Sequence, residues 1–408
     1  MTIKIRDGAT MQQLRARQSE GDGVFRVSKG LAVLNPHWAQ KANGENYADT
    51  VLPDRLVDLI RGRESPKISW KEIRSAWTGV LKTLGEPHHL ADLEERLRRL
   101  IDERLDRELD LPWAIQEIFT QALIPTVMAK LTPEEAARIR RDQHSKLLRL
   151  MRTEPREDST LETMRSAVIQ IRSGRVARRV IGQRAKGGRA REVDLADPIV
   201  DLLPTLGMDR AAHAVTSVLT AIAGPPGAVA VCMLLELTRR ADWRERIRRE
   251  LAAVDADDYR RAPARSAPIT YRFVREVLRL WSSPLVLTRV VRTSLCVQDE
   301  QLEEGDLFHL SPYFAHRDPK EWKDPEVFDP DRWLPASGGG PAHSCAYAPF
   351  GWAPTSCIGA GLGLNELLLL CRLFVTDYRI DAPAVDDVEV VMAAVPLPLG
   401  FRGTLGRR

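Results

Sequence analysis

A single cysteine, Cys357, stands in a glycine-punctuated loop at the start of an apolar helical run. The loop reads Phe350-Gly-Trp-Ala-Pro-Thr-Ser-Cys-Ile-Gly359, and its glycines suit a tight turn that places backbone N–H groups around a sulfur atom. Those donors and the following helix N-terminus stabilise a thiolate over a thiol. A buried structural thiol is the alternative, because free cysteines are among the most buried residues. The loop favours a thiolate that binds a metal.

The loop resembles the signature of the cytochrome P-450 family of haem-thiolate monooxygenases, Phe-x-x-Gly-x-x-x-Cys-x-Gly. The resemblance implies that Cys357 is the iron ligand and that the rest of the loop contacts haem b through Phe350, Gly351, Thr355 and Gly359. Two positions depart from the family pattern. Ala353 replaces its second glycine, and Thr355 replaces the Arg or His that binds a haem propionate. We expect Thr355 to hydrogen-bond a propionate more weakly than either would.

Glu276 and Arg279 are three residues apart and share one face of a predicted helix. Alone, such a pair is usually a solvated contact worth less than about 1 kcal/mol. Arg332, in Phe-Asp-Pro-Asp-Arg-Trp, stands where the family has the third member of a buried ionic triad. A buried Glu between two arginines is costly unless fully hydrogen-bonded. The resemblance therefore implies that the triad fixes the geometry beneath the haem.

Two further segments resemble haem-binding segments of the family. Arg289, which ends Ser-Pro-Leu-Val-Leu-Thr-Arg, corresponds to an arginine that binds a propionate. Trp70 and Arg74 resemble the family's Trp-x-x-x-Arg propionate clamp, one helical turn apart. A rival register places His88 or His89 in the tryptophan position, but neither is followed by Arg four residues later.

The longest apolar stretch, from about residue 211 to 237, is long enough to cross a membrane but contains Pro225-Pro226. A buried central helix is the better interpretation. Two consecutive prolines remove two helical N–H donors and clash with carbonyls one turn earlier, so we expect the helix to be kinked or locally open there. Three hydroxyls precede the kink and are candidates for substrate or water contacts, or simply bond their own helix: Thr216, Ser217 and Thr220.

The same position is where the family usually has an acid and an alcohol that relay protons to dioxygen. Aligned on Ala223-Gly224, the acid position holds Pro226 and the alcohol position holds Gly227, so neither side chain can donate a proton. We therefore mark Pro225, Pro226 and Gly227 as the altered catalytic segment, although a purely structural kink is the alternative. The substrate or an ordered water could supply the protons, peroxide could replace dioxygen, or radical coupling could need no relay.

Helical periodicity dominates the chain, so we expect a mainly α fold with a small β region (α+β), a long central helix over the haem, and one domain over residues 1–408. Helices are expected at about 92–108, 111–128, 133–152, 160–180 and 360–374, and around Glu276. Extended segments are expected at about 24–34, 285–297 and 306–310.

Charge and cysteine content exclude several classes of protein. The net charge is only +4, and the arginine-rich run over residues 172–191 lacks interleaved aromatics, which argues against nucleic-acid binding. That run is either a solvated helix face or a docking site for an acidic partner. Five scattered cysteines without Cys-x-x-Cys spacing argue against a disulfide framework and a zinc site and suit a reducing cytoplasm. The charged N-terminus lacks the apolar run of a signal peptide or anchor, so a cytoplasmic location is expected.

Taken together, the resemblance implies a haem-thiolate oxidase or monooxygenase, with electrons supplied by ferredoxin and ferredoxin reductase. We expect a monomer that acts on a small molecule, free or tethered to a carrier protein, in biosynthesis of a specialised metabolite by hydroxylation, ring closure or coupling. The alternatives are a peroxide-dependent enzyme, a non-oxidative haem isomerase or dehydratase, and a scaffold that has lost catalysis.

Overall fold

The computed structural model describes residues 3–46, 70–154, 156 and 158–408. Helices make up most of it. In chain order these are α1 (Ala9–Ala16), α2 (Pro36–Glu45), α4 (Trp70–Leu84), α5 (Pro87–Asp102), α6 (Leu111–Val127), α7 (Pro133–Leu150), α8 (Thr160–Ala185), α9 (Asp197–Asp201), α10 (Leu203–Ala221), α11 (Pro225–Arg239), α12 (Ala241–Leu251), α13 (Ala256–Arg261), α14 (Pro263–Ser266), α15 (Pro268–Leu280), α16 (Pro312–Ala315) and α17 (Ala360–Thr376).

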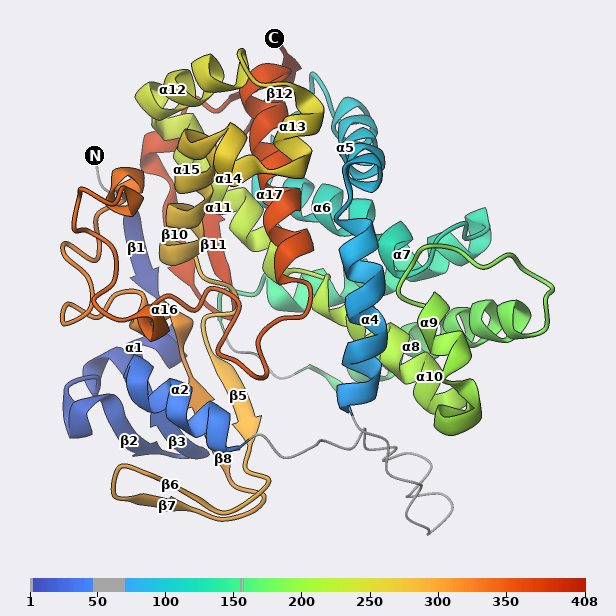
Figure 1. The fold of residues 1–408 in the computed structure, drawn as a ribbon, viewed down its shortest axis with the longest axis horizontal. Helices are drawn as coiled ribbons and strands as arrows, with labels where there is room; N and C mark the ends of the chain where they lie inside the picture. The colour runs from blue at the N-terminus through green and yellow to red at the C-terminus, as the bar shows by residue number, and fades with distance from the viewer. Residues whose placement is uncertain (1–2, 47–69, 155, 157) are drawn as a thin grey trace.

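The strands form small sheets at the edge of the helical body (Figure 1). β2 (Val24–Val27), β3 (Gly30–Val33), β8 (Leu307–Leu310) and β5 (Leu287–Val290) make a four-stranded sheet in that order. β1 (Lys4–Asp7) pairs in parallel with β10 (Glu389–Met392), which pairs with β11 (Pro396–Leu399). The remaining strands form a sheet of β4 (Glu108–Asp110), β12 (Arg402–Arg407) and β9 (Tyr378–Asp381) and a hairpin of β6 (Leu295–Val297) and β7 (Glu300–Leu302).

The larger of two main hydrophobic cores lies around α11 and α17, which stand side by side in the middle of the molecule (Figure 1). α5, α6 and α15 pack around this pair. A second core joins α4, α8, α9 and α10 on the other side of the molecule. Ile222, in the short segment between α10 and α11, packs against both cores. The segment that joins these two helices is therefore one link between the two cores, and α6, which contributes buried residues to both, is another.

The predicted helices and strands correspond to observed elements, but some boundaries are wrong. The helix expected at 160–180 extends to Ala185. The helix expected at 92–108 begins at Pro87 and ends at Asp102. Asp106 has φ +55°, and residues 108–110 are extended because they pair with β12 as β4. The strands β1 and β9–β12 were not predicted. β1 pairs with a strand more than three hundred residues later, whereas β10 and β11 form a hairpin that the periodicity did not reveal.

The central apolar stretch is two helices and not one. α10 ends at Ala221, Gly224 has φ +136°, and α11 begins at Pro225. The predicted kink is confirmed, and the proline clash is avoided because both prolines occupy the first turn of a new helix. By length and composition Leu203–Arg239 could cross a membrane, but 67% of its most apolar window is buried inside the protein. Such burial is what a core helix shows.

Four of the eight basic side chains in the run over residues 172–191 form ion pairs within the chain. Arg184 forms a buried ion pair with Asp194, and Arg189 pairs with Glu135. Arg191 bridges two carboxylates of α9. These pairs neutralise much of the positive charge that could have attracted an acidic partner.

Candidate active site

Backbone hydrogen bonds fold the loop before α17 tightly around Cys357. The Cys357 N–H donates to the Phe350 carbonyl at 2.8 Å, and the Gly351 N–H donates to the Ala348 carbonyl at 3.0 Å. Gly351 has φ +78°, a conformation that favours glycine. α17 begins directly after Gly359, so the cysteine stands at a helix N-terminus as expected.

The protein alone does not stabilise the Cys357 thiolate. Burial of the sulfur raises the pKa of the Cys357 thiol, and the Gly359 N–H and Arg74 offset this effect only in part. The residue is nevertheless exposed, in contrast to the three cysteines that are buried. A bound metal ion deprotonates a coordinating thiol outright. The cysteine is therefore accessible and needs a cation to ionise.

Two arginines from different elements flank the cysteine loop. Arg74, in the first turns of α4, donates to the Ser356 carbonyl at 2.9 Å. Arg289 lies on β5. Leu287 of the same strand lies next to Gly351 of the loop, because a Cβ atom added to Gly351 would be 3.3 Å from Leu287 Cδ1. α4 and β5 can be followed on two sides of this loop in Figure 1.

Arg289 is a partly buried cation that lacks an anion. Burial lowers the pKa of Arg289, and the nearby Arg292 lowers it further. Its Nε is buried without a hydrogen-bond partner, and its Nη1 has only the Thr288 carbonyl at 3.3 Å. Within the described part of the chain, neither Arg289 nor Arg74 forms an ion pair. Two guanidinium groups without a carboxylate partner, one in contact with the cysteine loop and one on the adjoining strand β5, suit a ligand that carries a metal and carboxylates, and haem has both.

Of the other residues predicted to contact haem, Phe350 and Thr355 lie in the cysteine loop and Trp70 does not. The Thr355 hydroxyl donates to Asn43 Oδ1 at 2.7 Å. Phe350 packs against the larger core. Trp70 begins α4, but its side chain lies outside the described residues. The roles of Trp70, Phe350 and Thr355 toward haem remain predictions.

Asn43, on α2, was missed by the sequence analysis. Its Nδ2 donates to the carbonyls of Trp352 and Ala353 at 2.9 and 3.0 Å, and its Oδ1 accepts from Thr355. One buried amide thus binds the cysteine loop at three points. No local pattern indicates this role, because Asn43 lies more than three hundred residues before the loop.

The predicted triad forms as a buried network beside the loop. Glu276 accepts two hydrogen bonds from Arg279, at 2.8 and 3.0 Å, and one from Arg332 at 2.9 Å. The Trp333 indole and the Asp329 N–H also donate to its carboxylate. All three triad side chains are almost fully buried, and the carboxylate is hydrogen-bonded on both oxygens. The charge is therefore compensated as a buried triad requires.

His316 connects this network to the cysteine segment and was also missed. Its Nε2 accepts from the Ala348 N–H at 2.8 Å, and its Nδ1 lies 2.8 Å from the Arg279 carbonyl. These partners assign the proton to Nδ1. Burial lowers the pKa of His316 to about 3, so the ring is neutral at pH 7.

The altered central segment lies against a cavity of about 780 Å³ between α7, α8 and α10. Its lining includes Ala223, Pro225 and the three predicted hydroxyls. Those hydroxyls donate to carbonyls of their own helix: Thr216 to Ala212, Ser217 to Ala214 and Thr220 to Thr216. Gly227 faces α6, where an added Cβ would be 3.0 Å from Gln116 Cα. A second cavity of about 480 Å³ adjoins the first at Arg149, Leu150 and Ala394.

The comparisons with known proteins agree on one family. The family model described as Cytochrome P450 matches residues 205–398. Pentalenene oxygenase from Streptomyces avermitilis is 22% identical over 403 residues, which cover 97% of this chain and 82% of that protein. Mitochondrial cytochrome P450 11B2 from Mesocricetus auratus is 29% identical over 171 residues, which cover 41% of this chain and only 33% of that protein.

The fold is similar to solved structures over nearly the whole chain. The crystal structure of the cytochrome P450DA heme domain superposes with a TM-score of 0.76 and 15% identity, covering 97% of this chain and 92% of that one. A mutant of the same heme domain gives a TM-score of 0.73 and 16% identity, covering 99% of this chain and 98% of that one. With the cysteine loop, the buried triad and the two arginines in place, this chain has the fold of a cytochrome P450 heme domain and matches the family model of Cytochrome P450, a family whose cofactor is haem.

Proposed function

We propose that this chain is a haem-thiolate oxidase or monooxygenase that acts on a small or carrier-bound molecule in specialised metabolism. The observation that carries the proposal is the exposed residue Cys357 in a loop that Arg74 contacts and that β5, the strand of Arg289, adjoins; neither arginine has an acidic partner in the described chain. Pentalenene oxygenase, which aligns with 97% of this chain, supports a role in bacterial specialised metabolism.

Around the cysteine loop, the residues of the chain would hold the haem and stabilise the Cys357 thiolate. Haem bound through a thiolate supplies the oxidative chemistry, because the thiolate donates electron density that favours O–O cleavage. Cys357 Sγ would bind the iron, and the Gly359 N–H would donate to the thiolate. Arg74 and Arg289 would bind the propionates, and Asn43 and His316 keep the loop in position.

At the altered central segment between α10 and α11, the chain lacks a side-chain proton relay. Pro225, Pro226 and Gly227 have no protic side-chain group, and the cavity hydroxyls already donate to their own helix. Those hydroxyls can still accept a hydrogen bond from water or substrate. We propose that the proton comes from the substrate or from water held there, or that the reaction avoids dioxygen cleavage by using peroxide or radical coupling.

The finer assignments are also proposals. A monomer in the cytoplasm that receives electrons from ferredoxin and its reductase is consistent with similarity to a full-length bacterial relative. Haem-dependent isomerisation or dehydration without electrons, and a scaffold role, are the competing functions that the missing relay permits.

The test combines haem spectroscopy with turnover. Cys357→Ser should abolish the thiolate-type Soret band, whereas Cys296→Ser, a change at another exposed cysteine, should leave it intact. Titration of the ferric protein with metabolite extracts should shift the band when a substrate displaces iron-bound water. Product that forms only with reduced ferredoxin or peroxide would support oxidation, and product without electrons would support the non-oxidative enzyme. An unchanged band in Cys357→Ser would overturn the proposal.

A further inference from the structure

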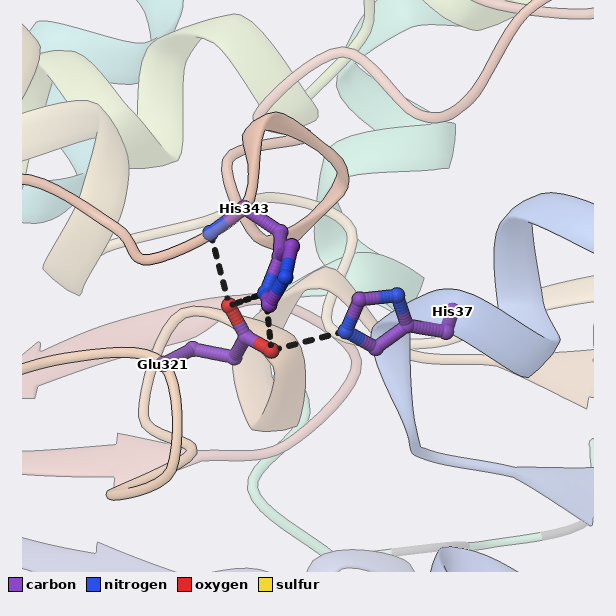
Figure 2. Close-up of side chains that lie close together, drawn as sticks. All are labelled: His37, Glu321 and His343. Atoms are coloured by element: carbon purple, nitrogen blue, oxygen red, sulfur yellow. Dashed lines mark hydrogen bonds and ion pairs between the residues drawn. The ribbon is translucent and has the colours of Figure 1, made fainter.

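Three side chains from distant parts of the sequence converge on the protein surface next to the cysteine loop. His37 is in the first turn of α2, Glu321 follows α16, and His343 directly precedes the short 3-10 helix at Ser344–Ala346. Figure 2 shows both imidazole rings turned toward the Glu321 carboxylate. This cluster is separate from the haem ligand and is used by no part of the proposed reaction.

The donor atoms have the spacing of a metal site. His37 Nε2 lies 2.8 Å from Glu321 Oε1, and His343 Nδ1 lies 3.2 Å from both carboxylate oxygens. One donor atom of each residue lies within 4.8 Å of the others. Ligands about 2.0–2.1 Å from a tetrahedral zinc ion are roughly 3.3 Å apart, so small rotations of the rings would admit the ion.

The ligand types also suit Zn²⁺. Two imidazole nitrogens and one carboxylate oxygen form a set that leaves a fourth tetrahedral position for water. The cysteine spacing in the sequence argues against a zinc site, but that argument concerns cysteine ligands. A site of two histidines and a glutamate spread over three hundred residues leaves no local spacing to recognise.

Outer contacts orient two of the ligands. His37 Nδ1 lies 3.6 Å from Cys345 Sγ, which leaves Nε2 as the nitrogen facing the carboxylate. The His343 N–H donates to Glu321 Oε2 at 3.0 Å, and the Ala342 N–H donates to the Glu321 carbonyl at 2.8 Å. The Glu321 side chain is therefore held by backbone groups as well as by the rings.

The two imidazole rings are exposed, so an ion can reach the cluster from solvent. The side chain of Glu321 is only 5% exposed, whereas those of His37 and His343 are 48% and 62% exposed. The carboxylate forms the floor and the two rings form the rim. An ion bound here would keep its open position toward water.

We propose that His37, Glu321 and His343 form a Zn²⁺ site that joins α2 to the segment leading into the cysteine loop. The Cys345 carbonyl accepts from the Trp352 indole at 2.8 Å, and α2 already holds the loop through Asn43. The ion would thus fasten the start of this segment at one end of α2, while Asn43 fastens the loop at the other end.

Metal binding by the tag-free holoprotein tests the site. After chelation and dialysis against Zn²⁺, the wild type should retain one zinc ion per chain. His343→Ala and His37→Ala should each weaken binding at least about 10-fold, a loss seen even for outer contacts of metal ligands. His144→Ala is the matched control, because His144 also faces a carboxylate, Glu117 Oε1 at 3.3 Å, and belongs to no three-residue cluster among the described residues.

Zinc-edge X-ray absorption separates this site from any other, and the haem iron does not interfere with it. A shell of nitrogen and oxygen at about 2.0–2.1 Å with imidazole scattering is expected. Zn²⁺ should also raise the melting temperature of the wild type and not that of Glu321→Gln, which retains the size of the side chain. No bound zinc, a sulfur shell, or equal binding in the wild type and in the alanine variants at positions 37 and 343 would overturn the proposal, whether or not the haem assignment holds.

Discussion

Two buried glutamates show how the surroundings of a single residue decide its charge. Glu276 accepts hydrogen bonds from two arginines, whereas both oxygens of Glu366 lack a hydrogen-bond partner in the described chain. Burial raises the pKa of Glu366 well above its usual value, and Arg96 opposes this only in part. The surroundings of Glu366 therefore favour its neutral, protonated form.

Replacing each glutamate with glutamine should separate these two states. Glu276→Gln removes the charge between buried arginines and should lower the free energy of unfolding by roughly 3–5 kcal/mol. Glu366→Gln replaces a carboxyl whose surroundings favour its neutral form with a neutral group of similar shape, and should change the free energy of unfolding by less than about 1 kcal/mol. Urea unfolding of both variants measures the difference, and equal losses would contradict the assignment.

His316 should make stability depend on acid. Burial lowers the pKa of the folded His316 ring to about 3, whereas an unfolded histidine has a pKa of about 6.5. Between these two pH values the unfolded chain binds a proton that the folded chain does not. This contribution to stability is present above about pH 6.5 and should fall by roughly 1 kcal/mol per pH unit as the pH drops toward 3.

The variant His316→Gln isolates this contribution. It should be less stable than the wild type at pH 7.5 because it disturbs the contacts with Ala348 and Arg279. The difference between the two proteins should shrink as the pH is lowered to 4.5. Urea midpoints across this range provide the measurement, and parallel pH profiles would rule out His316 as the titrating group.

Among the secondary structure elements, the break between α10 and α11 depends on Gly224. Its φ of +136° suits glycine, and an added Cβ would lie 1.8 Å from Leu150 Cδ2 on α7. Gly224→Ala should therefore destabilise the protein by about 1–3 kcal/mol. Gly79→Ala, on an open face of α4, should stabilise it by about 0.5–1 kcal/mol. Thermal melts compare the two, and a neutral Gly224→Ala would show that the backbone there relaxes freely.

These elements also show which parts of the site the sequence could predict. The cysteine loop and the Glu276–Arg279 pair depend on residues close in sequence, and both were predicted. Asn43, His316 and the pairing of β1 with β10 depend on contacts between residues that are far apart in the chain. Local periodicity contains no information about such partners, so they could not be predicted.

For the molecule as a whole, the two cores should open separately. α8 and α10 belong to the smaller core, whereas α11, α15 and α17 belong to the larger one. The outer face of α7 and α8 also exposes large apolar side chains: Leu148, Leu161, Met164, Val168 and Ile171. Amides of α8 and α10 should therefore exchange through openings of lower free energy than those of α11 and α17. Native-state hydrogen exchange tests this, and a single shared opening energy would contradict it.

The prolines at the start of α11 also affect how the 780 Å³ cavity interacts with solvent. A helix start usually presents several N–H groups that attract water or an acidic cap. Here Pro225 and Pro226 have none, and the Gly224 N–H donates to the Ile222 carbonyl at 3.1 Å, which leaves only the Gly227 N–H. This part of the cavity wall is therefore poor in hydrogen-bond donors, in contrast to the hydroxyl-bearing face of α10. The scarcity of donors is a property of the backbone itself.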